Sequence, residues 1–168
     1  MSTTTKPTTE REHYLETFER EYQTTLRVLK AYPPAQGKLK FADRSHTANE
    51  IAWTLVISQL VVEPILTAPR LEPMPMPVPD DFKAILAQFE KAHANVTLKL
   101  AKLDENTFQS SLTMPAGPGV TAPVRRADAL WMMLFDTVHH RGQFSVYLRA
   151  SGAKVPSIYG PSGDEPWM

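Results

Sequence analysis

Apolar residues recur at helical spacing in four stretches of this chain, and most of its prolines lie between those stretches. The first stretch opens at Thr9, which has capping-box spacing to Glu12, and Pro33 and Pro34 stop it. Its apolar face consists of Leu15, Phe18, Tyr22, Leu26 and Leu29. This pattern predicts an amphipathic helix that packs one face against a core.

A second capping box, from Thr47 to Glu50, opens the next stretch. The residues that share one face of this stretch are Ile51, Leu55, Ser58, Val62 and Leu66. The pattern predicts a helix that ends near Thr67, with Pro64 bending its last turn.

A connector, a third helix and a loop follow. Residues 69–79 are rich in proline and predict an extended connector. Asp80 is the expected N-cap of the third helix. The apolar residues of that helix are Phe82, Ile85, Leu86, Phe89, Val96, Leu100 and Leu103. Several prolines and glycines in residues 104–123 predict a long irregular loop, with a short extended piece at residues 108–114.

The last stretch predicts a helix over residues 125–150, which Gly152 closes in a left-handed conformation. Four long helices, without a convincing run of alternating strands, predict an all-α four-helix bundle with long connecting loops. We expect one domain over residues 1–168, with a flexible N-terminus at residues 1–8 and a C-terminal cap at residues 153–168.

The composition narrows the class of partner. The chain has 168 residues, of which 42% are hydrophobic, enough to bury a single core. Eighteen basic residues balance eighteen acidic ones, so no overall charge attracts nucleic acid. No apolar run approaches the roughly 18 residues that cross a bilayer, so we expect a cytoplasmic protein without a membrane span or a membrane partner. The absence of cysteine leaves His, Asp and Glu for metal or acid–base chemistry.

A cluster of polar side chains interrupts the apolar pattern of the fourth helix. Asp136 and His140 are spaced i, i+4, and they share a broad face with Met133, Gln143 and Tyr147. Because unpaired polar groups are costly to bury, a carboxylate and an imidazole on a face that should look into the bundle indicate a site. The cluster predicts a pocket that binds one cation or one small-molecule substrate.

A family resemblance appears at these residues. The run from Asp136 to Gln143, Asp-Thr-Val-His-His-Arg-Gly-Gln, and the tail at residues 155–162 resemble the DinB-like (YfiT-like) metalloenzymes. Helix order and lengths agree with that family over most of the chain. The resemblance implies a four-helix bundle, frequently a homodimer, with a divalent metal held by one residue of the second helix and two of the fourth. Some relatives are transferases that use a low-molecular-weight thiol, and others are hydrolase-like or isomerases.

The implied metal ligands are incomplete in this chain. The family's second-helix histidine lies in a segment similar to residues 50–55 here, and its position holds Thr54. The fourth-helix pair corresponds to Asp136 and His140, both acceptable ligands for zinc or nickel. A threonine hydroxyl is a weak ligand, so the third donor is weakened, replaced or lost.

Three interpretations stay open at this point. The first is a metal-dependent hydrolase or thiol S-transferase with His140 and Asp136 as ligands and catalytic groups, and with Ser58 in the pocket. Its missing donor would come from Glu50 or Ser58, one turn on either side of the threonine. The second is a metal-free, non-enzymatic bundle that binds a small molecule or serves as a dimeric stress or scaffold protein. The third is a structural hydrogen-bonded pair that Asp136 and His140 form with Arg141.

Overall fold

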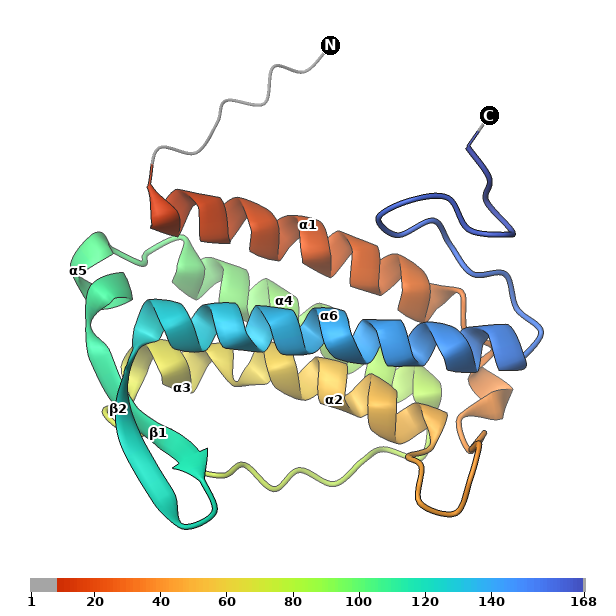
Figure 1. Cartoon of the computed structure of the whole chain (residues 1–168), viewed down its shortest axis with the longest axis horizontal. Helices are drawn as coiled ribbons and strands as arrows, with labels where there is room; N and C mark the ends of the chain where they lie inside the picture. Colours follow the sequence, from red (N-terminus) through yellow and green to blue (C-terminus); the bar gives the residue numbers. More distant parts are fainter. Residues whose placement is uncertain (1–8, 168) are drawn as a thin grey trace.

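The computed structural model describes residues 9–167, so the N-terminal segment expected to be flexible lies outside the described residues. Five helices form the bundle: α1 (Glu10–Lys30), α2 (Ala48–Leu60), α3 (Val62–Thr67), α4 (Phe82–Leu100) and α6 (Arg126–Ala150). α2 packs against α4 and α6, and α1 packs against the same two helices (Figure 1). The predicted four-helix bundle is confirmed, with α2 and α3 together supplying its second helix.

Local capping fixes where the helices begin. Both predicted capping boxes are present. The side chains of Thr9 and Thr47 accept hydrogen bonds from the backbone N–H groups of Glu12 and Glu50, and the two glutamate carboxylates accept hydrogen bonds from the backbone N–H groups of the threonines. The third helix differs by one residue from the prediction, because Asp81 and not its neighbour is the N-cap. The Asp81 carboxylate accepts a hydrogen bond from the backbone of the second residue after it.

The second helix is interrupted at a single residue, Val61, whose backbone stays in the right-handed helical region. α2 ends at Leu60, and α3 begins at Val62 and runs through Pro64 to Thr67. Proline has no backbone N–H, so the helical bond from position 64 to the carbonyl of Leu60 is missing. Helical hydrogen bonds from Val61 to Ile57 and from Ile65 to Val61 continue across the interruption, and the sequence located the irregularity correctly.

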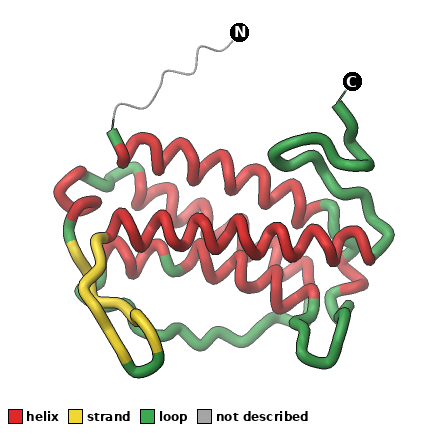
Figure 2. Tube along the Cα trace, viewed as in Figure 1, coloured by secondary structure: helices red, strands yellow, loops and turns green. Residues whose placement is uncertain are grey.

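The segment predicted to be an irregular loop contains regular structure. It forms a short helix, α5 (Glu105–Gln109), and an antiparallel hairpin of β1 (Ser111–Gly117) and β2 (Val120–Arg125), drawn as strands in Figure 2. Gly119 has a φ of 70° at the hairpin turn. Prolines are tolerated in both strands because each strand of a two-stranded ribbon has an edge without a full partner. The prediction of an irregular loop was therefore wrong, although the short extended piece expected at residues 108–114 overlaps β1.

Two groups of apolar side chains fill the interior. The first group lies toward the hairpin end and includes Tyr14, Ile65, Leu100, Phe108 and Leu130. The second lies toward the other end and includes Leu29, Val56, Phe82, Phe89 and Phe144. Most of the side chains in these two groups are less than 5% exposed, so both groups form well-buried apolar cores.

One described stretch, Ala48–Thr67, is long and apolar enough to cross a membrane by length and composition alone. The expectation that no apolar run approaches this length was therefore wrong for this stretch, in which Glu50 and Glu63 interrupt the apolar residues. In the fold these residues are α2 and α3, and 61% of the apolar window is buried inside the bundle. A core helix gives the same signal as a membrane helix.

Candidate functional site

Three predicted site residues, Ser58, Asp136 and His140, lie together where α2 and α6 pack against each other. Ser58 of α2 places its Oγ 3.4 Å from Oδ2 of Asp136 on α6. The other carboxylate oxygen, Oδ1, lies 3.3 Å from Nε2 of His140, one turn further along α6. Thr54 lies one turn before Ser58 on α2, and the Ser58 hydroxyl donates to its carbonyl.

The sequence predicted that the Asp136 carboxylate and the His140 imidazole point into the core. This prediction was wrong. The side chain of Asp136 is 39% exposed and that of His140 is 21% exposed. α6 buries a different face, which includes Leu130, Thr137 and Phe144. The pair therefore lies at the solvent edge of the α2–α6 contact, where water and small solutes reach it.

Gln143 extends the pair along α6. Its Oε1 is 3.0 Å from Nδ1 of His140, and its Nε2 is 2.9 Å from Nε2 of His139. The two imidazole rings are 5.0 Å apart and nearly perpendicular. The sequence placed His139 on a different face, yet Gln143 links the two histidines. A continuous row of hydrogen-bonding groups thus runs from Ser58 to His139.

A hollow of about 300 Å³ adjoins this row. Its lining residues are Phe41, Ser45, His46, Ile51, Gln143, Val146 and Tyr147. The predicted pocket residues Gln143 and Tyr147 are thus present. Burial raises the pKa of Tyr147, whose hydroxyl donates to the carbonyl of His46. Met133, which was also predicted, packs instead against the apolar group at the hairpin end.

Three lining residues, Phe41, Ser45 and His46, come from the loop before α2 and were missed by the sequence reasoning. The Phe41 ring meets the Tyr147 ring edge-on with centroids 4.5 Å apart. A loop has no periodicity from which its inward residues are read. The hollow lies next to the row of polar groups because Gln143 belongs to both.

Arg141 does not take part in this site. Its Nη1 lies 2.8 Å from Oε2 of Glu21 on α1, and its Nη2 donates to the hydroxyl of Tyr159 in the C-terminal tail at 2.6 Å. The interpretation in which Arg141 forms a buried pair with Asp136 and His140 is therefore wrong.

Comparison with known proteins identifies the family of this chain. The model of the DinB family matches residues 1–167. The chain belongs to the DinB family. A curated relative, the uncharacterized protein YrdA of Bacillus subtilis, is 24% identical over 159 residues, which are 92% of this chain and 90% of YrdA.

Solved structures of DinB-like proteins share the fold. One from Bacillus cereus has a TM-score of 0.72 at 21% identity and covers 88% of this chain and 97% of its own. YjoA of Bacillus subtilis has a TM-score of 0.71 at 16% identity, with 93% and 99% covered. YfiT of Bacillus subtilis has a TM-score of 0.66 at 14% identity, with 92% and 94% covered. YfiT is described as a probable metal-dependent hydrolase with an unusual four-helix-bundle topology.

The side chains of this site do not fit a tightly held transition metal. Thr54, at the implied third ligand position, donates its hydroxyl to the carbonyl of Glu50 at 3.1 Å. The Glu50 carboxylate accepts the backbone N–H of Thr47, which lowers the pKa of Glu50 and keeps that side chain in the capping box. In residues 9–167 no three His, Asp or Glu side chains gather closely enough to hold a metal. Catalytic and structural zinc sites use at least three protein ligands.

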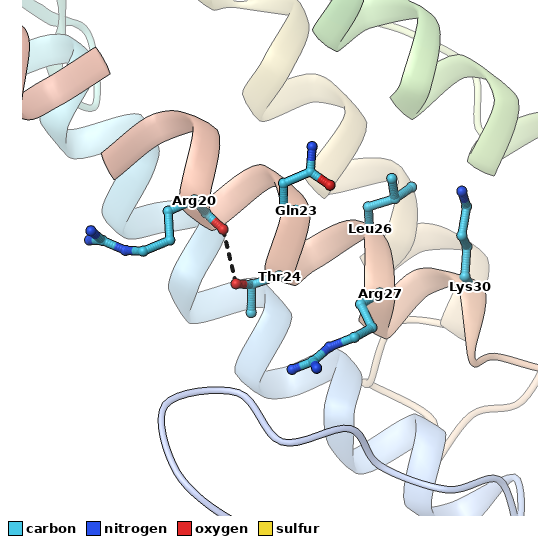
Figure 3. Close-up of a pocket in the computed structure, with 6 residues that line it drawn as sticks. All are labelled: Arg20, Gln23, Thr24, Leu26, Arg27 and Lys30. Atoms are coloured by element: carbon cyan, nitrogen blue, oxygen red, sulfur yellow. Dashed lines mark hydrogen bonds between the residues drawn. The ribbon is translucent and has the colours of Figure 1, made fainter. Parts of the chain in front are cut away.

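A larger hollow lies elsewhere, on the outer face of α1 (Figure 3). Its lining residues are Arg20, Gln23, Thr24, Leu26, Arg27 and Lys30. Lys30 is paired with Glu90 at 2.8 Å, and Arg27 lies 3.9 Å from Glu165. This surface has no histidine or carboxylate among its lining residues, so the smaller hollow beside His140 is the better candidate for chemistry.

Proposed function

We propose that the α2–α6 edge is the reaction site of a small-molecule enzyme of the hydrolase type, in which Asp136 and His140 act as an acid–base pair without a tightly bound metal. The observation that carries this proposal is the 3.3 Å contact between Asp136 Oδ1 and His140 Nε2, beside an apolar hollow. An imidazole oriented by a carboxylate at the edge of a pocket is a common arrangement for general acid–base catalysis.

The proposed reaction uses both ring nitrogens of His140. The Nε2–H donates to Asp136, which fixes the tautomer, and the Nδ1 lone pair is the base once the Gln143 amide turns its Oε1, an acceptor, away from that nitrogen. When a substrate displaces the exposed Gln143 amide, Nδ1 accepts a proton from a water molecule whose oxygen bonds to the electrophilic carbon. The bond from that carbon to the leaving group then breaks, and His140 returns the proton to the leaving group. A thiol from solution takes the place of the water in the transferase version of the same step.

The metal-dependent version of the function stays a prediction for this chain. Among the described residues of this site, Asp136 and His140 are the two strong metal ligands, and Thr54 and Ser58 supply hydroxyls that bind transition metals weakly. A divalent ion held by this set would have low affinity, and we assign it no step in the reaction.

The test measures hydrolysis of short-chain p-nitrophenyl esters, with and without a low-molecular-weight thiol. We expect His140→Ala to lower kcat/KM by about 10²–10⁴-fold, the usual contribution of a general base. Asp136→Asn should lower it less, because the imidazole remains. The matched control is His13→Ala, an exposed histidine outside the site. Activity that a chelator abolishes and zinc restores would contradict the metal-free proposal, and equal activity in His140→Ala would contradict the site itself.

One observation favours a second candidate, a non-enzymatic binder. Both ring nitrogens of His140 already have partners within the protein, Asp136 and Gln143. In that case the hollow binds a small apolar molecule without turning it over. Calorimetric titration with the corresponding non-hydrolysable amides separates the two: binding that Tyr147→Ala weakens, together with no hydrolysis in any sample, supports the binder.

A further inference from the structure

The apolar hollow beside His140 contains two aromatic rings in contact. Phe41, in the loop before α2 (orange in Figure 1), is 50% exposed, and its ring meets the Tyr147 ring edge-on with centroids 4.5 Å apart. Tyr147 on α6 and Ile51 on α2 are buried lining residues. The half-exposed Phe41 ring is therefore open to contact with a third group in the hollow.

The loop before α2 is closed by its own hydrogen bonds. The backbone N–H of Ala48 donates to the carbonyl of Leu39 at 3.0 Å, so the two ends of residues 40–47 lie together. The Tyr147 hydroxyl donates to the carbonyl of His46 and ties the loop to α6. Compact loops with close ends are frequently functional, and a side chain held in place before binding loses little entropy when a ligand arrives.

The lining of the hollow is nearly uncharged. None of its seven described lining residues is Lys, Arg, Asp or Glu. The His46 side chain, which also lines it, is 71% exposed and lies 3.8 Å from the Glu50 carboxylate. A charged ligand group would lose hydration in the hollow without gaining an opposite charge, so the hollow favours uncharged apolar groups.

The size and the position of the hollow indicate which part of a ligand it holds. Its volume is about 300 Å³. An apolar cavity of about 150 Å³ binds benzene, so a phenyl group with a short chain fits. Gln143 lines the hollow, and its Oε1 lies 3.0 Å from Nδ1 of His140. Because Gln143 belongs to both, a carbon attached to a group in the hollow comes next to the imidazole.

We propose that the hollow is the acyl subsite of the candidate enzyme and binds an uncharged aryl group one carbon away from the reacting carbonyl, with Phe41 as the residue that selects it. Stacked or edge-on contact with two aromatic rings favours an aryl group over a saturated ring of the same size. This inference rests on the proposed hydrolase function. The oxygen of water bonds to the carbonyl carbon, the bond to the alcohol oxygen breaks, and the proton passes through His140 to the alcohol.

Four p-nitrophenyl esters with the same leaving group test the acyl preference: acetate, phenylacetate, cyclohexylacetate and para-carboxyphenylacetate. Each rate is divided by the uncatalysed rate of the same ester. We expect kcat/KM for phenylacetate to exceed that for each of the other three by about tenfold, within the range that a hydrophobic pocket achieves. Phenylacetate that reacts no faster than any one of the others would overturn the proposal.

Two variants change the preference and one serves as the control. Phe41→Ala should lower the phenylacetate-to-acetate ratio by about tenfold, because the ring contact is lost. Val146→Lys adds a cation at a lining position that is 56% exposed, and should raise the ratio of para-carboxyphenylacetate to phenylacetate by about fivefold. Phe135→Ala removes a ring that is 64% exposed on α6 and does not line the hollow, and should keep the native ratios.

Circular dichroism verifies that the three variants fold. An unchanged ratio in Phe41→Ala or in Val146→Lys, or the same loss in Phe135→Ala as in Phe41→Ala, would overturn the assignment of the hollow as the acyl subsite.

Calorimetric titration with phenylacetamide and acetamide separates this inference from the proposed function. If no sample hydrolyses any ester, but phenylacetamide binds more tightly than acetamide and Phe41→Ala removes the difference, the hydrolase fails and the aryl site stands. If hydrolysis depends on His140 but shows no phenyl preference, the hydrolase stands and the aryl subsite fails. Phenylacetamide that binds no more tightly than acetamide also overturns the aryl site.

Discussion

Arg141 of α6 and Glu21 of α1 form an ion pair of 2.8 Å in which the two side chains are only 1% and 5% exposed. The Tyr159 hydroxyl accepts a hydrogen bond from Arg141 and donates one to the Glu21 carboxylate at 2.7 Å. Thr25 Oγ1 accepts a further bond from the guanidinium at 3.2 Å. This network joins the first helix, the last helix and the C-terminal tail.

Removing the guanidinium should destabilise the bundle strongly. Arg141→Met leaves the Glu21 carboxylate buried without its partner, and we expect the free energy of unfolding to fall by about 3–5 kcal/mol. Urea unfolding followed by circular dichroism measures this loss. The double variant Glu21→Leu, Arg141→Met should lose less than Arg141→Met alone. Lys30→Met, which removes an exposed ion pair with Glu90, should cost at most about 1 kcal/mol. An equal loss in Lys30→Met and Arg141→Met would contradict the argument.

The attachment of the C-terminal tail to the bundle should depend on the Tyr159 hydroxyl. Tyr159→Phe keeps the ring over the Arg141 guanidinium, 5.0 Å from its centroid, but removes the two hydrogen bonds. We expect a loss of about 1–3 kcal/mol in unfolding free energy, because partners of the hydroxyl are left unsatisfied. Trp167→Phe, in the same tail and 68% exposed, is the control and should change stability little. No measurable loss in Tyr159→Phe would show that the tail is held by other contacts.

The helices were predictable because their signals are local. Thr9 and Thr47 each lie three residues from their glutamate partners, so the sequence shows both capping boxes directly. The hairpin was missed because Pro115 and Pro123 are normally strand breakers, and they are accepted only because each strand has an open edge. Whether a strand accepts a proline depends on which of its edges is paired, and no local sequence pattern predicts that pairing.

The contacts of the candidate site also divide into those that local spacing predicts and those that depend on the packing of distant segments. Asp136 and His140 were predicted to meet because i, i+4 spacing on a helix brings side chains together whatever the surroundings. Phe41 joins the hollow from a loop, and Arg141 pairs with Glu21 over 120 residues of sequence. Those contacts follow from how helices pack, so the sequence alone left the partner of the arginine open.

Gly37 should not tolerate a side chain. Its backbone is ordinary, with φ near −54°, but an added Cβ would lie 2.1 Å from Oδ1 of Asn49. The Asn49 amide cannot swing away freely, because its Nδ2 donates to the carbonyls of Pro79 and Asp80. We expect Gly37→Ala to lower unfolding free energy by about 1–3 kcal/mol through this overlap. Gly160→Ala, where a Cβ meets nothing within 4 Å, is the thermal-unfolding control. Equal melting temperatures for the two variants would count against the steric explanation.

His93 should make stability depend on pH. Burial lowers the pKa of His93 below its usual 6.5, although the Glu19 carboxylate 2.9 Å away opposes this effect. The unfolded chain therefore binds a proton at a higher pH than the folded one, and stability falls as pH drops below about 6.5 toward the folded pKa. His93→Gln should flatten this slope in urea unfolding between pH 5 and 7. His13→Gln, at an exposed histidine, should keep the native slope. If His93→Gln keeps the pH slope of the native chain, groups other than His93 cause the pH dependence of stability.

Thr54→His should restore a metal site. The new imidazole would join Asp136 and His140 at the position where the family resemblance implies the third ligand, and three such donors suffice for zinc. We expect the variant to hold about one equivalent of zinc or nickel, and the native chain less than about a tenth of an equivalent, by elemental analysis of protein purified without added metal.

The matched control for that variant is Thr24→His, which adds a histidine on the exposed face of α1. It should bind no more metal than the native chain, since no carboxylate or imidazole lines that surface. Adding Asp136→Ala to Thr54→His should abolish the gain, because only two donors would remain. A native chain that binds metal as tightly as Thr54→His would show that a donor outside the predicted set completes the site. The acid–base proposal would then give way to a metal-dependent reaction.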